Sequence, residues 1–228
     1  MSEIFQGLIL DKDNDYEPVA YPYKKFFNFN EPQGRAIAEV LDWDAVTVYE
    51  KLDGQLCTVY FYDNQWQVAS SGTFFFFPSH PTKKILNHNQ GTPDACGFVC
   101  GITFANLFWQ IWGKLGYKKP ERCHSHITFI FEMLSPRATI IVVPASDSIV
   151  LHGARDMNTL EELQPLPLAE EYGWQSAKAF DHLRSMEDVQ KAAAALNPIK
   201  DEGFVICDGM LLKWWWKSFF WGGGLLVC

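Results

Sequence analysis

The chain of 228 residues has the composition of a folded protein with an acidic balance of charge. Hydrophobic residues make up 48% and charged residues 20%, so a sizeable core is available and disorder is not expected. The formal net charge of −8 argues against nucleic-acid binding by bulk positive charge, but it does not exclude a local basic groove.

The sequence predicts neither a targeting segment nor a membrane anchor. Its first residues, MSEIFQGLILDKDND, lack a basic region followed by the apolar run of a signal peptide. No stretch has the ~20 consecutive apolar residues that a membrane-spanning helix needs. The six cysteines are interpreted as thiols rather than as a disulfide framework. We therefore expect an intracellular, soluble protein.

The first predicted elements are a helix and a set of paired strands. The stretch NEPQGRAIAEVLD, residues 30–42, predicts a helix whose N-cap is Asn30. Residues 46–62 and 66–70 alternate in the manner of paired strands, and Asp63-Asn64 would supply the turn between them.

The second half of the chain predicts further strands with helices between them. A helix over residues 103–116 should end at Gly116, because glycine suits the left-handed residue that follows a helix. Strands that arrive in pairs indicate an α+β fold with antiparallel sheets flanked by helices, built as a single domain over residues 1–228. The other predicted elements are strands over residues 126–135 and 139–145, helices over residues 160–172 and 185–196, and a closing hairpin that turns at Asp208-Gly209.

A lysine stands in an unusual place in the stretch VYEKLDGQLCTVYF, residues 48–61. On a strand, Lys51 and Asp53 would point to the same side, and Gly54 would let the chain turn tightly or approach a ligand. A lysine attacks phosphorus only as the neutral amine, so a nucleophilic lysine needs burial, a metal ion or a neighbouring cation. The alternative interpretation is a surface hairpin in which Lys51 and Asp53 form a weak charge pair.

Carboxylates and further lysines occur on predicted strands downstream. Glu132 interrupts the apolar strand TFIFEML, and Glu202 leads into the apolar strand of DEGFVI. A buried carboxylate is costly unless it is paired or holds an ion. Lys213 and Lys217, in LKWWWKS, would share one face of a late strand. This set suits phosphoryl transfer, because carboxylates hold Mg²⁺ against phosphates while lysines neutralise the charge on the phosphate oxygens.

These motifs, in this order, resemble those of the lysyl-adenylate nucleotidyltransferases, the superfamily of ATP-dependent RNA ligases, DNA ligases and mRNA capping enzymes. The motifs are EKLDG, SSGT, FIFEMLSP, DEGFVI and KWWWKS. Three further segments, KKFFNFNE, TFANLFWQIWGKLGY and VLHGARDMNTLEE, are similar to the phage-type, tRNA-repair RNA ligases. The resemblance covers roughly residues 17–218. It implies the nucleotidyltransferase fold of a ligase adenylation domain, without a C-terminal accessory module.

The resemblance also implies a role for each motif residue. Lys51 would attack the α-phosphate of ATP, form a covalent lysyl-AMP and release pyrophosphate. AMP would pass to an RNA 5′-phosphate, and an RNA 3′-hydroxyl would then displace it to seal the strand. Glu132 and Glu202 would act in catalysis and hold Mg²⁺ or Mn²⁺, and Lys217 would contact the α-phosphate. The other nucleotide-binding residues would be Glu50, Asp53, Gly54, Gly72, Lys25 and Lys213.

Other interpretations stay open at the level of sequence. Four positions where the family commonly carries a cation hold other residues: Tyr21, Ser71, Thr139 and Trp215. The main alternative is therefore a ligase-like protein that binds ATP or RNA ends with little or no catalysis. Cations that could replace the missing ones are Lys24, Lys25, Arg35 and Arg137. A DNA ligase or capping enzyme fits less well, because KKFFNFNE does not resemble those enzymes. A purely structural domain leaves the two strand carboxylates unexplained, and the need for a separate RNA-binding partner is open.

Overall fold

The computed structural model describes residues 7–23, 27–70, 85–87, 98–99, 102–140, 142–197, 201–208 and 224–227. The chain divides into two compact units, each assembled from separate stretches of sequence. Unit 1 comprises Met1–Phe5, Tyr23–Asp53 and Ala177–Cys228, and unit 2 comprises Gln6–Pro22 and Gly54–Ser176. A single domain over the whole chain stays a prediction.

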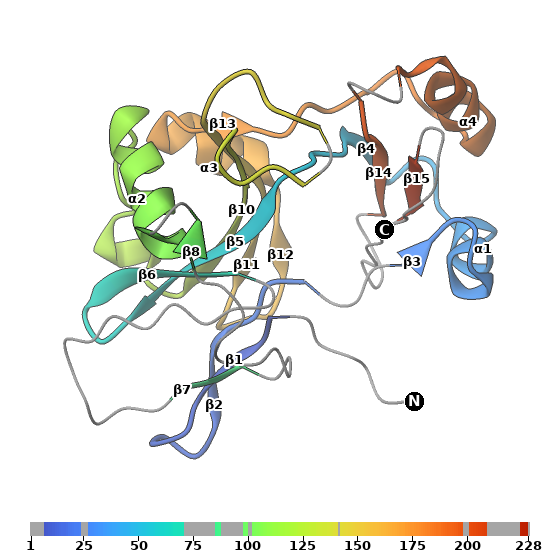
Figure 1. Cartoon of the computed structure of the whole chain (residues 1–228). Coiled ribbons are helices and arrows are strands. Elements are labelled where there is room, and N and C mark those ends of the chain that lie inside the picture. The colour runs from blue at the N-terminus through green and yellow to red at the C-terminus, as the bar shows by residue number, and fades with distance from the viewer. Residues whose placement is uncertain are drawn as a thin grey trace. The chain divides into compact units, whose positions relative to one another are not determined.

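Within the described residues, unit 2 is built on a six-stranded sheet (Figure 1). The strand order is β12-β11-β10-β5-β6, and neighbouring strands on this path are antiparallel. A further strand, β13, runs parallel to β11. The strands are β5 (Gln55–Tyr62), β6 (Gln65–Ser70), β10 (Ile127–Leu134), β11 (Ser148–Asp156), β12 (Glu162–Leu163) and β13 (Gln175–Ser176).

One face of this sheet packs against α2 (Phe104–Lys114) and α3 (Pro165–Tyr172). Alternate residues of β10, among them Phe129 and Phe131, are fully buried in this core. Helix α2 begins because the Thr103 hydroxyl accepts the backbone N–H of Asn106 at 3.1 Å. Its end is followed by Gly116 with φ of 70°, as the sequence predicts.

The other face of the sheet carries a smaller layer of strands. A second core, which includes Ile9, Ala20, Tyr60 and Ala69, joins the β1–β2 pair to β5 and β6. The residues of β10 and β11 that point away from the helices share this face, and Glu132 is one of them. The remaining elements of unit 2 are β1 (Ile9–Asp11), β2 (Glu17–Ala20), β7 (Ile85–Asn87), β8 (Phe98–Val99), β9 (Ile102–Thr103) and the 3₁₀ turn Arg122–His124.

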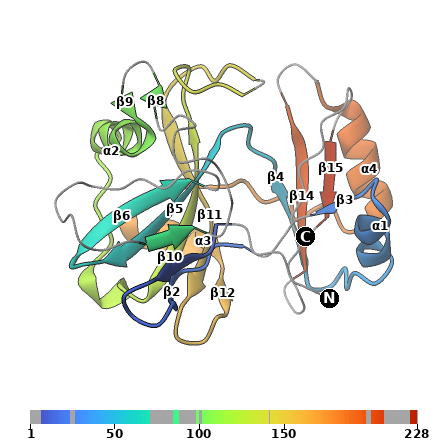
Figure 2. The same cartoon turned by 60° about the horizontal axis from the view of Figure 1, so that its bottom comes forward.

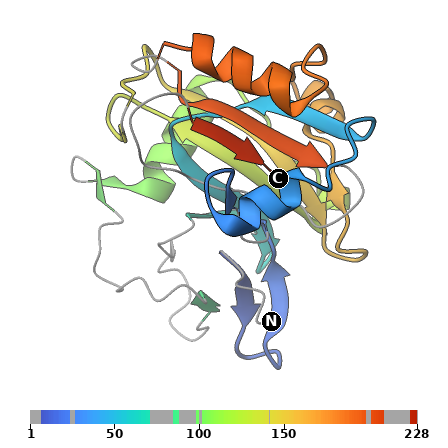
Figure 3. The same cartoon turned by 90° about the vertical axis from the view of Figure 1, so that its right-hand side faces the viewer.

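Unit 1 contains a four-stranded sheet among its described residues, in the order β3-β15-β14-β4. Strands β14 and β15 are parallel, and β4 is antiparallel to β14. Helices α1 and α4 lie on one side of this sheet (Figure 2), and α4 runs alongside β14 (Figure 3). The elements are β3 (Phe27–Asn28), α1 (Pro32–Ala38), β4 (Val46–Glu50), α4 (Met186–Ala195), β14 (Gly203–Asp208) and β15 (Gly224–Val227).

Most predicted elements are present, with several differences in detail. Asp63 and Asn64 both have positive φ, 51° and 60°, as a two-residue hairpin turn requires. The predicted strand over residues 139–145 is wrong, since its described residues form an irregular loop. The helix predicted over residues 160–172 begins only at Pro165. The hairpin predicted at Asp208-Gly209 extends into residues outside the described ones.

None of the helices among the described residues has the length and apolar character needed to cross a membrane.

Candidate active site

Lys51 lies directly after β4 and is nearly buried, with its side chain 9% exposed. Residues 51–53 are not part of a strand, so the prediction that Lys51 and Asp53 share a strand face is wrong. The backbone holds Lys51 in place, because its N–H donates to the carbonyl of Gly203 at 3.0 Å. The surface-hairpin interpretation is also wrong, since a residue at an exposed hairpin tip would not be buried.

The side chain of Lys51 forms an ion pair with the carboxylate of Glu202. Glu202 directly precedes β14, and β14 pairs with β4 so that Phe204 lies opposite Glu50. Sheet pairing within unit 1 therefore brings together two motif residues that are 151 positions apart in the sequence. The Glu202 side chain is 12% exposed, so both charges are largely withdrawn from water and depend on each other for compensation.

Glu50 is engaged with the backbone of a neighbouring segment in unit 1. Its Oε1 accepts the N–H of Lys178 at 2.8 Å, while the backbone N–H of Glu50 donates to the carbonyl of Lys178 at 2.9 Å. The N–H of Phe180 in turn donates to the carbonyl of Val48 at 2.8 Å. These bonds fasten residues 178–180 along β4, the strand that ends at the lysine.

Glu132 lies in unit 2, within β10. Its Oε1 accepts the backbone N–H of Gly54 at 3.1 Å. Gly54 has no room for a side chain, because a Cβ would lie 2.6 Å from the carbonyl oxygen of Met133 and 2.9 Å from Cγ of Glu132. Gly54 is thus needed for close approach to β10 rather than for an unusual backbone angle.

Two further residues near Glu132 were not predicted as site residues from the sequence. His152 on β11 has Nε2 3.5 Å from Glu132 Oε2, and its side chain is 5% exposed. Cys57 on β5 is fully buried, and burial together with the charge of Glu132 raises the pKa of its thiol well above the ordinary value. The VLHGARD segment, which supports the family resemblance, was the available signal for His152.

The predicted site residues fall into three groups. Lys51 and Glu202 meet in unit 1, where Asp53 is also buried and Glu50 accepts the N–H of Lys178. Gly54 and Glu132 meet in unit 2. Four predicted residues lie outside the described residues: Lys25, Gly72, Lys213 and Lys217.

The metal roles predicted for Glu132 and Glu202 stay predictions. Among the described residues, no three His, Cys, Asp or Glu side chains gather in a way that could hold a metal ion. Both carboxylates nevertheless have the oxygen donors that Mg²⁺ and Mn²⁺ prefer.

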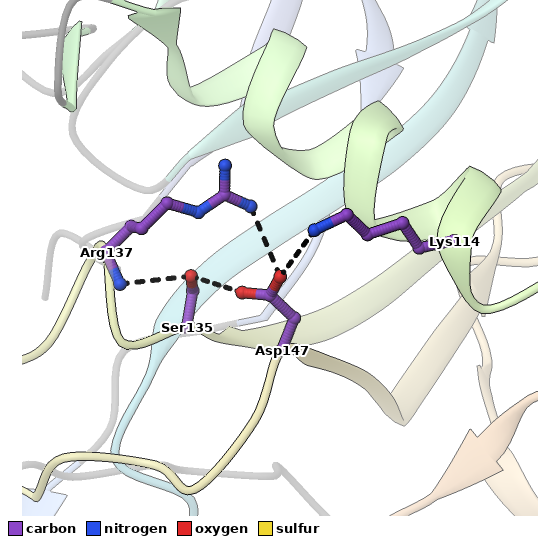
Figure 4. Close-up of polar contacts among 4 residues, drawn as sticks. All are labelled: Lys114, Ser135, Arg137 and Asp147. Carbon is purple, nitrogen blue, oxygen red and sulfur yellow. Dashed lines mark hydrogen bonds and ion pairs between the residues drawn. The ribbon is translucent and has the colours of Figure 1, made fainter.

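Arg137, one of the candidate replacement cations, is part of a cluster around Asp147 (Figure 4). Asp147 Oδ2 lies 3.3 Å from Arg137 Nη2 and 3.2 Å from Lys114 Nζ, and Oδ1 accepts the Ser135 hydroxyl at 2.6 Å. Burial alone would raise the pKa of Asp147. The hydrogen bonds from Ser135 and Lys114 and the charge of Arg137 outweigh burial and hold the pKa below its ordinary value.

Tyr21, which stands at a family arginine position, packs against a buried cation from β11. The guanidinium carbon of Arg155 lies 4.4 Å from the centre of the Tyr21 ring. Arg155 also donates to the carbonyl oxygens of Pro22 at 3.0 Å and Leu160 at 2.5 Å, and to Glu162 Oε1 at 2.6 Å. These hydrogen bonds of the Arg155 guanidinium are thus made to acceptors within the protein rather than left for a ligand.

Comparison with known proteins identifies RNA ligases as relatives. A family model described as RNA ligase matches residues 5–91. An RNA ligase of Rhodothermus phage RM378 is 26% identical over 176 residues, which are 67% of this chain and 37% of the phage protein. An archaeal ATP-dependent RNA ligase has a TM-score of 0.54 at 16% identity, over 91% of this chain and 48% of that one. A Naegleria gruberi RNA ligase solved with ATP and Mn has a TM-score of 0.48 at 13% identity, over 92% of this chain and 58% of that one.

The archaeal structure supports the fold predicted from the sequence, an α+β arrangement of helices on antiparallel sheets. This chain spans little more than a third of the length of the phage relative and about half of the archaeal chain.

Proposed function

We propose that this chain is a member of the phage-type RNA ligase family and that it is an ATP-dependent RNA ligase that works through a lysyl-AMP intermediate. The single observation that carries the proposal is the buried ion pair of Lys51 and Glu202. Lysine is rarely buried unless it has a partner, and a titratable pair that is buried in this way is a candidate functional site.

In the proposed reaction, Nζ of Lys51 attacks the α-phosphorus of ATP, the P–N bond forms, and the bond to pyrophosphate breaks. The attack requires the neutral amine, and Glu202 is the neighbouring acceptor for the proton that Lys51 loses. The Gly203 carbonyl restrains the Lys51 backbone, so the side chain starts from one defined position.

The second and third steps transfer and release AMP. A 5′-phosphate oxygen of RNA attacks the phosphorus of the lysyl-AMP, and the P–N bond to Lys51 breaks. An RNA 3′-hydroxyl then attacks the 5′-phosphate, the phosphodiester forms and AMP leaves. Glu132 and Glu202 would hold Mg²⁺ or Mn²⁺, which when bound neutralises charge on the phosphate oxygens. Asp53, Gly54, Gly72, Lys25, Lys213 and Lys217 complete the proposed set of nucleotide contacts, with Glu50 beside the adenine.

A second candidate function is a ligase-like protein that binds ATP or RNA ends without efficient catalysis. The surroundings of Arg137 and Tyr21 favour this alternative. Arg137 is already paired with Asp147, and the Tyr21 ring is packed against an arginine whose hydrogen bonds go to protein acceptors. Neither Arg137 nor Arg155, the arginine against the Tyr21 ring, is thus an uncommitted cation for the triphosphate.

Incubation of the protein with Mg²⁺ and ATP labelled in its α-phosphate distinguishes these functions. Label should remain on the denatured wild-type protein and be absent from Lys51→Ala. Lys12→Ala is the control, because Lys12 lies exposed in the β1–β2 turn. Unlabelled wild-type protein that still binds ATP would support the binding function instead.

The acceptor is tested next, with 5′-phosphorylated RNA and DNA oligonucleotides of the same sequence. Sealing of RNA ends by the protein alone would support an RNA ligase that needs no partner. Labelled protein that seals neither would indicate that a separate RNA-binding partner is required.

A further inference from the structure

The extra residue of a β-bulge in β11 is His152, and it lies on the same face of the sheet as Glu132. Phe131 is opposite Leu151 and Ile130 is opposite Gly153, so His152 has no partner position on β10. The bulge also changes which residues of β11 face the helices. Before the bulge these are the odd-numbered Ile149 and Leu151, and after it the even-numbered Ala154. Bulges re-aim side chains and are frequent beside active sites.

Each of the two carboxylate oxygens of Glu132 contacts a different residue, and the two contacts together orient the carboxylate plane. Oε1 accepts the Gly54 N–H at 3.1 Å, and Oε2 lies 3.5 Å from Nε2 of His152. The imidazole is 5% exposed and the carboxylate 12% exposed, so water competes little with either contact. The contact between Nε2 and Oε2 is a charge contact rather than a hydrogen bond, so rotation of the carboxylate would break the hydrogen bond from Gly54 and lengthen the contact with His152.

We propose that His152 is a positioning residue: it holds the Glu132 carboxylate on the Gly54 amide and so fixes the turn that follows the lysine nucleophile. The proposal rests on the proposed function for its catalytic consequence, but its structural part concerns the Gly54 amide alone. Gly54 is three residues after Lys51, and its close packing on β10 leaves little slack in that turn. Loss of the imidazole would therefore affect the chemical step more than the binding of ATP.

The same pair of strands offers a matched control. His126 has Nε2 3.8 Å from Asp156 Oδ2, so it is also a histidine facing a carboxylate between the start of β10 and the end of β11. Its side chain is 36% exposed, and it lies at the opposite end of β10 from Glu132. A change at His126 shows whether the loss of any histidine–carboxylate pair between β10 and β11 affects the Gly54 amide and lysyl-AMP formation.

The experiment compares His152→Phe, His152→Gln and His126→Phe with the wild type. Phenylalanine keeps a ring but has no donor, whereas the amide nitrogen of glutamine can reach the position of Nε2. The first readout is hydrogen exchange at the Gly54 amide, with the Val59 amide in the middle of β5 as internal reference. The second is the rate of lysyl-AMP formation as a function of ATP concentration.

For His152→Phe we expect protection of the Gly54 amide to fall about tenfold while Val59 is unchanged. The maximal rate of lysyl-AMP formation should fall about 10- to 100-fold, with the KM for ATP changed less than about twofold. His152→Gln should recover most of both losses, and His126→Phe should resemble the wild type. If His152→Phe does not fold, His152→Asn replaces it, because an asparagine amide is too short to reach Glu132.

Unchanged protection of Gly54 in a folded His152→Phe or His152→Asn protein would overturn the proposal. Equal losses in His126→Phe would also overturn it, since the effect would then not be specific to Glu132. A wild-type protein that takes no label from ATP would contradict the proposed function. The exchange of the Gly54 amide would still decide the positioning role of His152.

Discussion

The backbone N–H of Gly54 donates to Oε1 of Glu132 at 3.1 Å, linking the residue just before β5 to a carboxylate on β10. The two residues are 78 positions apart, and both were predicted to belong to the nucleotide site for separate reasons. Their contact means that Glu132 has a structural task in the free protein in addition to any contact with a ligand. A change at either residue should therefore alter folding stability and labelling together.

Gly54→Ala should destabilise unit 2 and reduce lysyl-AMP formation. The new Cβ would lie 2.6 Å from a backbone carbonyl oxygen, which cannot move aside as a flexible side chain could. We expect a loss of about 1–3 kcal/mol in the free energy of unfolding, measured by urea denaturation. Labelling by ATP should fall at least about tenfold, because the turn after Lys51 must shift.

Gly113→Ala is the matched control for this substitution. Gly113 lies within α2, and a Cβ there has no atom within 4 Å. Alanine at an open helical position should leave stability unchanged or raise it by up to about 1 kcal/mol. Equal stability of Gly54→Ala and wild type would contradict the predicted collision.

Glu202→Gln should leave the buried charge of Lys51 without its partner. We expect the free energy of unfolding to fall by about 3 kcal/mol and the lysyl-AMP signal to be lost. Glu187→Gln serves as control, because its ion pair with Lys191 on α4 is exposed and contributes little. The double variant Lys51→Met, Glu202→Gln should lose less free energy of unfolding than the two single variants lose together, and the difference should exceed about 1 kcal/mol. Additive losses would mean that the two residues are not energetically coupled.

The elements that carry the site could be predicted where local pattern and tertiary structure agree. Strand β10 is an apolar run with one carboxylate, and this pattern correctly placed Glu132 on a strand. Asp63-Asn64 and Gly116 were found because few residues tolerate positive φ, so the chemistry of the turn is visible locally. The ion pair of Lys51 with Glu202 was not predicted from the sequence, and its cause is the β4–β14 ladder.

The sequence misled where tertiary contacts override local preference. Residues 139–145, TIIVVPA, are β-branched and apolar, yet Val143 is 69% exposed in a loop. A hydrogen bond from the Ser135 hydroxyl to Asp147 joins the two ends of that loop. The next strand is β11, whose sequence SIVLHGARD is more polar than TIIVVPA. His152 could not be assigned a role from the sequence, because the bulge that re-aims it has no local signature.

Arg155→Lys should be destabilising even though the charge is retained. The guanidinium donates to two carbonyl oxygens and to Glu162, and it packs on the Tyr21 ring, which an ammonium group cannot reproduce in this geometry. We expect a loss of about 2–3 kcal/mol in the free energy of unfolding. Arg35→Lys on the exposed side of α1 should change stability by less than about 0.5 kcal/mol. A loss below about 0.5 kcal/mol for Arg155→Lys would contradict a stabilising role for these guanidinium contacts.

Asp147 should make the stability of unit 2 depend on pH in the acidic range. Its pKa in the folded protein is below the ordinary value, mainly because the hydrogen bonds and nearby cations outweigh the opposing effect of burial. The folded state thus binds this proton less readily than the unfolded state does. The stabilisation is therefore fully present above the unfolded pKa of about 3.9 and is lost as pH falls through the folded pKa.

Urea denaturation of the wild type and Asp147→Asn at pH 7, 5 and 3 checks this sign. The wild type should be more stable by about 1 kcal/mol at pH 7 and at pH 5, and the difference should shrink at pH 3. Lys114→Gln should cost less than Arg137→Gln, because the Lys114 side chain is 65% exposed and its ion pair is screened by water. Asp44→Asn, at an exposed site in unit 1, controls for the loss of a carboxylate and should change stability little at any of these pH values. A difference between wild type and Asp147→Asn that grows as the pH falls would contradict the direction of the pKa shift.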